Sequence, residues 1–125
     1  MQLKFYKCDI CHKVIVVTSY PTGIETICCD QPMHEITPNT TDGAKEKHIP
    51  VVETTNNQIT VSIGSQVHPM EEAHYIEWIC IETNLGWQIK YLKPHCQPTA
   101  RFRLADQEQL RFAYCYCNVH GLWRK

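Results

Sequence analysis

The sequence predicts a mainly β protein, with a small metal-binding domain followed by an antiparallel β-sandwich. Two observations carry this prediction. Four of the eight cysteines fall within the first 29 residues, and much of the remaining chain alternates apolar with polar residues. Period-two segments separated by short turns are typical of antiparallel sandwiches and barrels. No long segment with helical periodicity competes with this interpretation.

Residues 1–36 are expected to form the first domain. Strands are predicted at residues 3–7 and 14–18, followed by a turn at Pro21-Thr22-Gly23 that returns the chain to its second pair of cysteines. A segment this short cannot bury enough apolar area to fold alone. Bound metal is therefore expected to supply much of its stability.

Residues 37–125 are expected to form the second domain, which begins with a polar, turn-rich linker at residues 37–43. Five strand-like segments follow, each with apolar residues at alternate positions. These residues are Ile59, Val61 and Ile63; Ile76, Trp78 and Cys80; Trp87, Ile89 and Tyr91; Phe102 and Leu104; and Leu110, Phe112, Tyr114 and Tyr116.

The composition excludes several classes of protein. The 125 residues are 43% hydrophobic, as in globular proteins, and the formal net charge of −1 argues against a nucleic-acid partner. No export signal opens the sequence and no apolar run reaches transmembrane length, so we expect a soluble, cytoplasmic protein with no membrane partner. Thiols stay reduced in the cytoplasm, where clustered cysteines more often bind metal than form disulfides.

Cys8, Cys11, Cys28 and Cys29 are the first set of candidate metal ligands. The Cys-x-x-Cys spacing lets two thiolates reach one ion. Adjacent side chains of a strand point to opposite faces, so Cys28 and Cys29 can share that ion only if the backbone turns there. Four thiolates suit iron or zinc equally. His12 completes the C-x-x-C-H pattern of haem attachment, but that alternative requires export and leaves the second cysteine pair without a role.

A second set of candidate ligands is rich in histidine: His48, His68, His74, Cys117 and His120. His68 and His74 are too far apart for one face of a helix, but they can converge if the segment at Pro69 turns between two strands. Gly121 permits a tight backbone path after the Cys-x-x-His pair. Any one of these histidines alone would more often be an ordinary polar residue, so the joint pattern is the informative feature.

The other cysteines fall outside both ligand sets. We expect Cys80 to be a small buried residue and Cys96 to lie in a loop. Cys115 should lie on the same side of its strand as Cys117. His34 and His95 are expected at the surface.

Six segments carry a family resemblance that spans nearly the whole chain in order. They are Cys8-x-x-Cys11; Cys28-Cys29-x-Gln31-Pro32-Met33; Thr41-Asp42-Gly43-Ala44-x-Glu46-Lys47-His48-Ile49-Pro50-Val51; His68-Pro69-Met70-Glu71-Glu72-x-His74-x-Ile76-Glu77-Trp78-Ile79; Leu92-Lys93-Pro94; and Cys117-Asn118-Val119-His120-Gly121-x-Trp123. Together they resemble desulfoferrodoxin, the two-centre form of superoxide reductase.

The resemblance implies a desulforedoxin-like first domain that holds one iron ion through its four cysteines. It also implies an immunoglobulin-like β-sandwich that holds a second iron ion. There His48, His68, His74 and His120 would be equatorial ligands, Cys117 would be axial and one position would stay open. The implied reaction delivers one electron and two protons to superoxide, giving hydrogen peroxide without release of dioxygen.

Two further residues lie directly before His48. The ammonium group of Lys47 can lie over the open position and attract the superoxide anion, and Glu46 matches the family carboxylate that can occupy this position in the ferric resting state. The alternative for both residues is an ordinary solvated Glu–Lys pair. Family members are commonly homodimers, and their electron donor is often a rubredoxin. Two alternatives stay open: a rubredoxin-like electron-transfer protein without its own catalysis, and a zinc-binding structural module.

Overall fold

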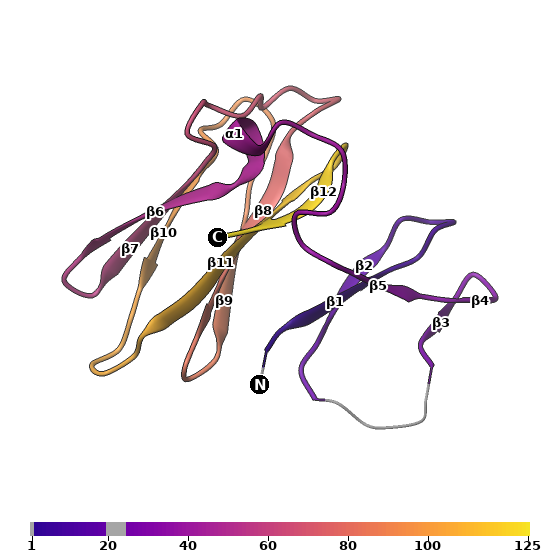
Figure 1. Ribbon diagram of the computed structural model, residues 1–125, viewed down its shortest axis with the longest axis horizontal. Helices are drawn as coiled ribbons and strands as arrows, with labels where there is room; N and C mark the ends of the chain where they lie inside the picture. The colour runs from indigo at the N-terminus through magenta and orange to yellow at the C-terminus, as the bar shows by residue number, and fades with distance from the viewer. Residues whose placement is uncertain (1, 20–24) are drawn as a thin grey trace. The chain divides into compact units, whose positions relative to one another are not determined.

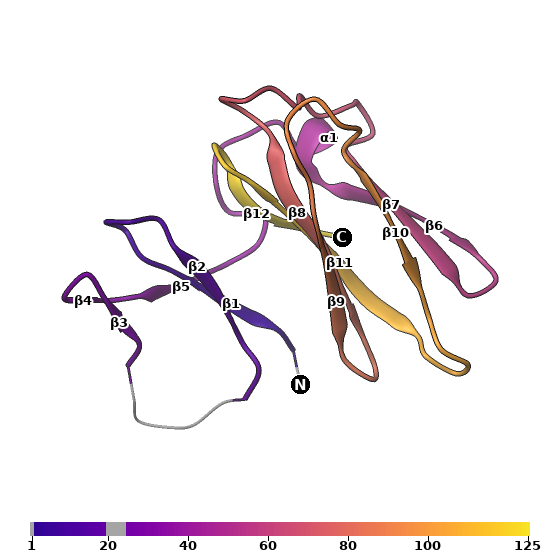
Figure 2. The same cartoon turned by 180° about the vertical axis from the view of Figure 1, so that it is seen from behind.

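The computed structural model describes residues 2–19 and 25–125, which form two compact units at residues 1–37 and 38–125. Nearly all regular structure is β, as predicted, and the strands of each unit can be followed in Figures 1 and 2. The turn predicted at Pro21-Thr22-Gly23 lies outside the described residues. None of the helices in the described part of the chain has the length and hydrophobicity needed to cross a membrane.

The first unit is built around a small antiparallel sheet. β1 (Lys4–Lys7) lies between β2 (Val14–Val17) and β5 (His34–Ile36), and β3 (Ile27–Cys28) pairs with β4 (Gln31–Pro32) as a separate ribbon. Among the described residues of this unit, the buried apolar side chains are Leu3, Phe5, Cys8 and Met33. So small a core contributes little burial free energy, which agrees with the expected need for bound metal.

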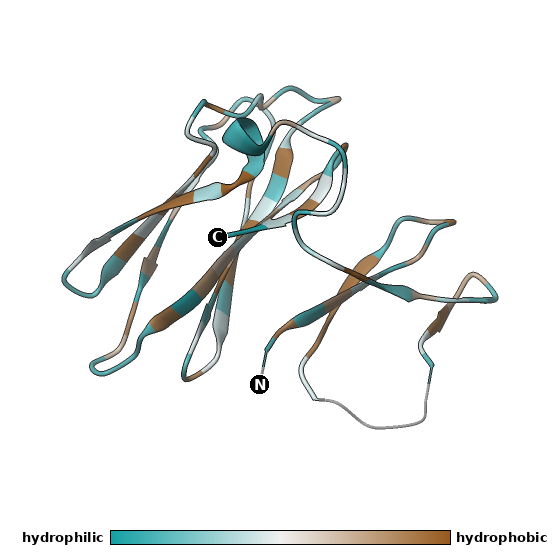
Figure 3. Cartoon of the chain, in the orientation of Figure 1, coloured by the Kyte–Doolittle hydropathy of each residue, from teal (hydrophilic) through white to brown (hydrophobic). Residues whose placement is uncertain are grey.

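The second unit is a sandwich of two antiparallel sheets (Figure 1). One sheet has the order β10–β7–β6 and the other the order β12–β11–β8–β9. Their bounds are β6 Pro50–Thr55, β7 Gln58–Ile63, β8 Ile76–Thr83, β9 Trp87–Tyr91, β10 Thr99–Arg103, β11 Leu110–Cys117 and β12 Gly121–Arg124. The segment before β6 forms a single helical turn, α1 (Lys45–His48), which is hydrophilic along its length (Figure 3).

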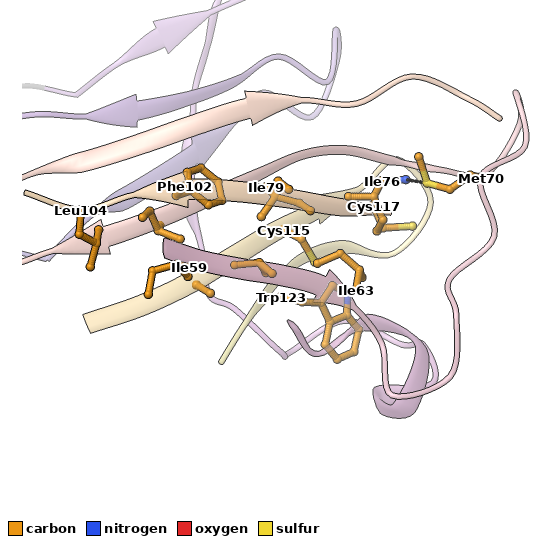
Figure 4. Packing of buried hydrophobic residues seen from close by; sticks show 14 residues of the cluster. Ile59, Ile63, Met70, Ile76, Ile79, Phe102, Leu104, Cys115, Cys117 and Trp123 are labelled. Atoms are coloured by element: carbon orange, nitrogen blue, oxygen red, sulfur yellow. Dashed lines mark hydrogen bonds between the residues drawn. The ribbon is translucent and has the colours of Figure 1, made fainter. Parts of the chain in front are cut away.

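The core of the sandwich lies between the two sheets and follows the predicted alternation in β7, where Ile59, Val61 and Ile63 are fully buried. Figure 4 shows Cys117 and Met70 at the end of this core that lies opposite Leu104. The Met70 sulfur there accepts a hydrogen bond from the backbone N–H of Ile76 at 3.4 Å. One end of the core therefore carries polarisable sulfur groups.

The alternation predicted for residues 76–80 does not hold throughout β8. Ile76 pairs with Cys117 and Trp78 with Tyr116, so Glu77 is an extra residue in β8 at this point. Such a bulge shifts the alternation of side chains by one residue. Positions that would face the core in a regular strand therefore face away from it beyond the bulge. Beyond it Ile79 and Ile81, rather than Trp78 and Cys80, belong to the core cluster.

β11 has a register shift of its own, between Leu110 and Phe112. Its core-facing residues are Ala113, Cys115 and Cys117, rather than Tyr114 and Tyr116, which are buried on the other face. Cys80 is buried, as expected, and Cys115 lies on the same side as Cys117. Because both faces of these central strands are buried, their sequence lacks a clear polar side.

Candidate metal centres

The four cysteines of the first unit come together in space. Each sulfur lies within 4.8 Å of the other three, and the cysteines form no disulfide. The Sγ atom of Cys28 is 3.6 Å from that of Cys11 and 4.0 Å from that of Cys29. Such a cluster of free thiols has the donor set of a four-coordinate metal site.

Two tight backbone turns produce this convergence. Cys8 directly follows β1, and the N–H of His12 donates to the Cys8 carbonyl at 3.0 Å, which closes the turn that carries Cys11. In the second turn Cys29 and Asp30 have φ angles of 52° and 60°, in the left-handed region. The backbone therefore turns at the adjacent cysteine pair, as a shared ion requires.

The thiols of the first unit differ in acidity. Backbone N–H groups of Cys11 and Ile10 stabilise the Cys8 thiolate and lower its pKa to about 7. Hydrogen bonding of its proton to the sulfur atoms of Cys11 and Cys8, together with burial, raises the pKa of Cys28 to about 12. Hydrogen bonding to Cys11 also raises the pKa of Cys29. The cluster thus retains protons that a metal cation would displace.

Four histidines form a closed ring at one end of the sandwich. The ring centroids of neighbours are 4.7 to 5.0 Å apart in the order His48, His68, His74, His120 and back to His48. Across the ring, the centroids of His48 and His74 are 6.4 Å apart. The ligand atoms of His48, His74, Cys117 and His120 all lie within 4.8 Å of one another, and His68 joins this group through His48.

Different elements supply these side chains. His48 ends α1, His68 and His74 lie in the loop between β7 and β8, and Cys117 and His120 flank the turn from β11 to β12. The loop reaches α1 through backbone hydrogen bonds, including one from Gln66 N–H to the Glu46 carbonyl at 2.9 Å. Gly121, with φ 79°, allows the chain to enter β12 directly after His120.

Hydrogen bonds orient two of the imidazole rings. The Nδ1 atom of His48 lies 2.7 Å from the Ala44 carbonyl, and that of His68 lies 2.6 Å from the Pro69 carbonyl. A carbonyl only accepts, so each Nδ1 donates and each Nε2 keeps a lone pair. These two Nε2 atoms are 3.2 Å apart. Two acceptors at this distance repel each other unless a cation lies beside them.

The other candidate ligand atoms lie close to these two. His120 presents Nδ1, which is 3.1 Å from the Nε2 of His48 and 3.8 Å from the sulfur of Cys117. In the described part of the chain, the Nε2 of His74 is buried without a hydrogen-bond partner. The unpartnered Nε2 of His74 therefore lies near the lone pairs of His48 and His68 and near the thiol of Cys117. This set of donor atoms fits a transition-metal ion such as iron.

Burial favours the neutral form of three of these imidazoles. It lowers the pKa of His48 and of His74, and it lowers the pKa of His68 to about 4. The positive charge of Lys47 further lowers the pKa of His48 and His74, although Lys47 itself is exposed. Neutral imidazole is the form that binds metal.

Cys117 is the fully buried sulfur of this group. Burial raises its pKa, while backbone N–H groups of His120 and Val119 lower it, and the His120 N–H lies 3.4 Å from its sulfur. Cys115 lies in the same core, and its thiol donates to the backbone carbonyl of His48 at 3.3 Å. Cys96 is exposed in the loop after β9, as expected.

The remaining predicted site residues lie in α1. Glu46 and Lys47 are both exposed there, directly before His48. Trp123 ends the last motif of the family resemblance, but the sequence predicts no role for it. Its ring stacks on His48 with centroids 4.8 Å apart, and its Nε1–H donates to the His120 carbonyl at 3.1 Å. The Thr41 hydroxyl donates to the same carbonyl.

Comparisons with known proteins agree with this pair of sites. The family model of the desulfoferrodoxin N-terminal domain matches residues 1–36, and the desulfoferrodoxin model matches residues 40–125. A desulfoferrodoxin homolog from Archaeoglobus fulgidus is 42% identical, and a desulfoferrodoxin from Nitratidesulfovibrio vulgaris is 43% identical. Each alignment covers 98% of this chain and 95% of the relative.

Solved structures give the same result. The crystal structure of the superoxide reductase from Treponema pallidum matches with a TM-score of 0.85 and 35% identity, covering 100% of this chain and 99% of that one. The four-cysteine group and the imidazole–cysteine group fit the two iron centres of desulfoferrodoxin and superoxide reductase. The chain therefore belongs to the desulfoferrodoxin family.

Proposed function

We propose that this oxidoreductase is a superoxide reductase, which converts superoxide to hydrogen peroxide by adding one electron and two protons, without releasing dioxygen. The observation that carries the proposal is the closed ring of four imidazoles with one buried cysteine beside it. We propose His48, His68, His74, Cys117 and His120 as the ligands of the catalytic iron. The solved relative from Treponema pallidum, itself described as a superoxide reductase, supports this reaction.

Bound iron would supply one-electron redox chemistry and a position for a small anion. The chain's residues set the conditions for that chemistry. Imidazole binds a metal in its neutral form, so Cys117 would bring the single negative charge of the proposed ligand set. The backbone N–H of His120 stabilises this thiolate, and burial keeps water from its sulfur.

Lys47 is proposed to attract superoxide to the site. Its ammonium group is exposed, yet its charge reaches His48 and His74 strongly enough to lower their pKa values. Because the chain as a whole carries a net charge of −1, attraction of an anion must come from local cations such as this one. Glu46 is proposed as the carboxylate that occupies the open position in the resting oxidised protein.

We further propose that residues 1–36 form an electron-transfer domain, with iron bound by Cys8, Cys11, Cys28 and Cys29, and that residues 37–125 form the catalytic domain. A rubredoxin as electron donor, a homodimeric assembly and a cytoplasmic location are expectations that follow from the sequence and its family resemblance.

The products of a superoxide pulse test the reaction. Reduced, iron-loaded protein should yield one hydrogen peroxide for each superoxide consumed, with no dioxygen evolved. A dismutase would yield half as much peroxide together with dioxygen. A pure electron carrier would leave superoxide to decay at its uncatalysed rate, and either result would contradict the proposal.

A further inference from the structure

Asn118 lies between two proposed ligands in sequence and bonds to the loop that carries a third. Its side-chain Oδ1 accepts from the backbone N–H of Tyr75 at 2.9 Å, and its Nδ2 donates to the Ala73 carbonyl at 3.1 Å. Its own backbone N–H donates to the Tyr75 carbonyl at 3.2 Å. These three hydrogen bonds hold both neighbours of His74, one on each side.

His74 needs such support more than His48 and His68 do. The rings of His48 and His68 are oriented by their own hydrogen bonds to carbonyl groups. Among the described residues, the ring of His74 has no such bond, and its buried Nε2 is unpartnered. Its backbone instead forms an isolated bridge with Glu71, at 2.9 and 3.0 Å, which closes a loop between the two residues. The direction of the ring therefore depends on how this loop is held.

We infer that Asn118 is a positioning residue of the imidazole–thiolate centre, which fixes His74 relative to Cys117. Cys117 ends β11, and Asn118 follows it directly, so the three hydrogen bonds join the end of that strand to the His74 loop. Two ligands from separate segments are thereby held as one unit. The inference rests on the ligand set proposed above.

The chain contains a second asparagine with the same geometry and no metal ligand nearby in sequence. Asn84 accepts from the Gln109 N–H at 2.7 Å, donates through Nδ2 to the Gln107 carbonyl at 3.4 Å and donates through its backbone N–H to the Gln109 carbonyl at 3.1 Å. It follows the end of β8 that pairs with the start of β11, whereas Asn118 lies at the opposite end of that ladder. Asn84 thus serves as a matched control, because its replacement removes the same kind of hydrogen bonds at a place without proposed metal ligands.

The test compares Asn118→Ala with Asn84→Ala in the full-length, iron-loaded protein. Iron affinity of the imidazole–thiolate centre is measured by competition with a ferrous chelator, and the four-cysteine centre serves as an internal reference. Loss of a residue that orients a metal ligand typically costs about 10- to 100-fold in metal affinity. We expect that loss, and an altered visible spectrum of this centre, for Asn118→Ala alone. Equal effects of the two variants, or no effect of either, would overturn the inference.

Two further variants keep the test decisive if Asn118→Ala folds poorly. Asn118→Asp retains the acceptor for Tyr75 N–H but loses the donor to Ala73, so we expect a smaller loss of iron affinity than with alanine. In a His74→Ala background, Asn118→Ala should add little further loss, because the ligand that it orients is gone. A fully additive loss would assign Asn118 another role.

These measurements separate the inference from the proposed reaction. Iron affinity and spectrum do not require superoxide. A wild-type protein that binds iron but fails to reduce superoxide would contradict the proposed function and leave the role of Asn118 intact. A protein that reduces superoxide normally, with iron affinity unaffected by Asn118→Ala, would do the reverse.

Discussion

The first unit holds its ligands with almost no core, whereas the sandwich places its ligands at the end of a large one. Of the four buried apolar side chains described in the first unit, Cys8 is itself a proposed ligand. The sandwich cluster has 14 buried residues, and among them only Cys117 is a proposed ligand. We therefore expect bound metal to contribute to the folding of the first unit, and we expect the sandwich to fold without metal.

Removal of iron should produce the largest contrast between the units. Without metal, we expect the first unit to lose its ordered structure because its remaining core is too small, while the sandwich stays folded. Hydrogen exchange followed residue by residue would show loss of protection in β1 and β2, with protection kept in β8 and β11.

Cys28→Ser should reproduce this effect selectively. It removes one thiolate from the first centre and leaves the imidazole–thiolate centre loaded with iron. Cys96→Ser, an exposed cysteine outside both sets, is the matched control and should leave both centres unchanged. Loss of iron from both centres in Cys28→Ser would contradict the division between the units.

Replacement of Trp123 should give the next largest effect, because this residue belongs to the sandwich core and also contacts two proposed ligands. Trp123→Ala should cost about 3–5 kcal/mol of unfolding free energy through the cavity that it leaves. Trp123→Phe should recover most of that stability but lose the hydrogen bond to the His120 carbonyl, which would shift the spectrum of the centre.

Trp87→Ala is the control for this prediction. Trp87 lies at the edge of its sheet with 36% of its surface exposed, against 1% for Trp123, so its removal should cost far less. Denaturant unfolding of the metal-free variants measures both effects. A small loss of unfolding free energy in Trp123→Ala would mean that the packing of this residue does not support the imidazole–thiolate site.

Most of both ligand sets could be predicted from the sequence because cysteine and histidine are the usual soft metal ligands and their spacings match a known family. The turn at Cys29 was predictable too, since two adjacent thiols cannot otherwise face one ion. The strand β7 could also be predicted, because one of its faces is more exposed than the other and its apolar and polar residues alternate regularly.

Other features depend on contacts that the sequence pattern does not carry. The bulge at Glu77 follows from the register between β8 and β11, and both strands are buried on two faces, so alternation could not reveal it. The bonds of Asn118 and the stack of Trp123 on His48 join segments far apart in the chain. The motifs contained these residues, but only the fold shows what they contact.

A change at Lys47 should have a smaller effect, confined to the rate of reaction at the second centre. Lys47→Ala should slow the reaction with superoxide several-fold at low salt and flatten its dependence on ionic strength, because the local attraction of the anion is lost. Lys47→Arg should retain both properties. Pulse radiolysis over a range of salt concentrations measures them.

Lys45→Ala is the matched control, because Lys45 is an equally exposed lysine of the same helical turn. The charge of Lys47 lowers the pKa of His48 and His74, and Lys45 lies farther from His48 along the chain. Equal slowing by the two alanine variants would assign the attraction to the general charge of α1, and unchanged kinetics for Lys47→Ala would remove its proposed role.

The smallest expected effect is a difference in proton release when each centre takes up iron near neutral pH. The raised pKa values of Cys28, about 12, and of Cys29 mean that the first unit must expel protons to bind metal. In the sandwich, His68, with a pKa of about 4, is already neutral, and burial lowers the pKa of His48 and His74 as well. Cys117 is then the main source of protons there.

We therefore expect Cys28→Ser to remove more than half of the protons released by the whole protein on loading with ferrous iron. A pH indicator in weakly buffered solution measures the release, and atomic absorption gives the iron bound, so the result is expressed as protons per iron. Equal values for the variant and the wild type would mean that the two ligand sets enter binding in the same protonation state. That result would contradict the expectation that the four-cysteine centre releases more protons on binding iron than the imidazole–thiolate centre does.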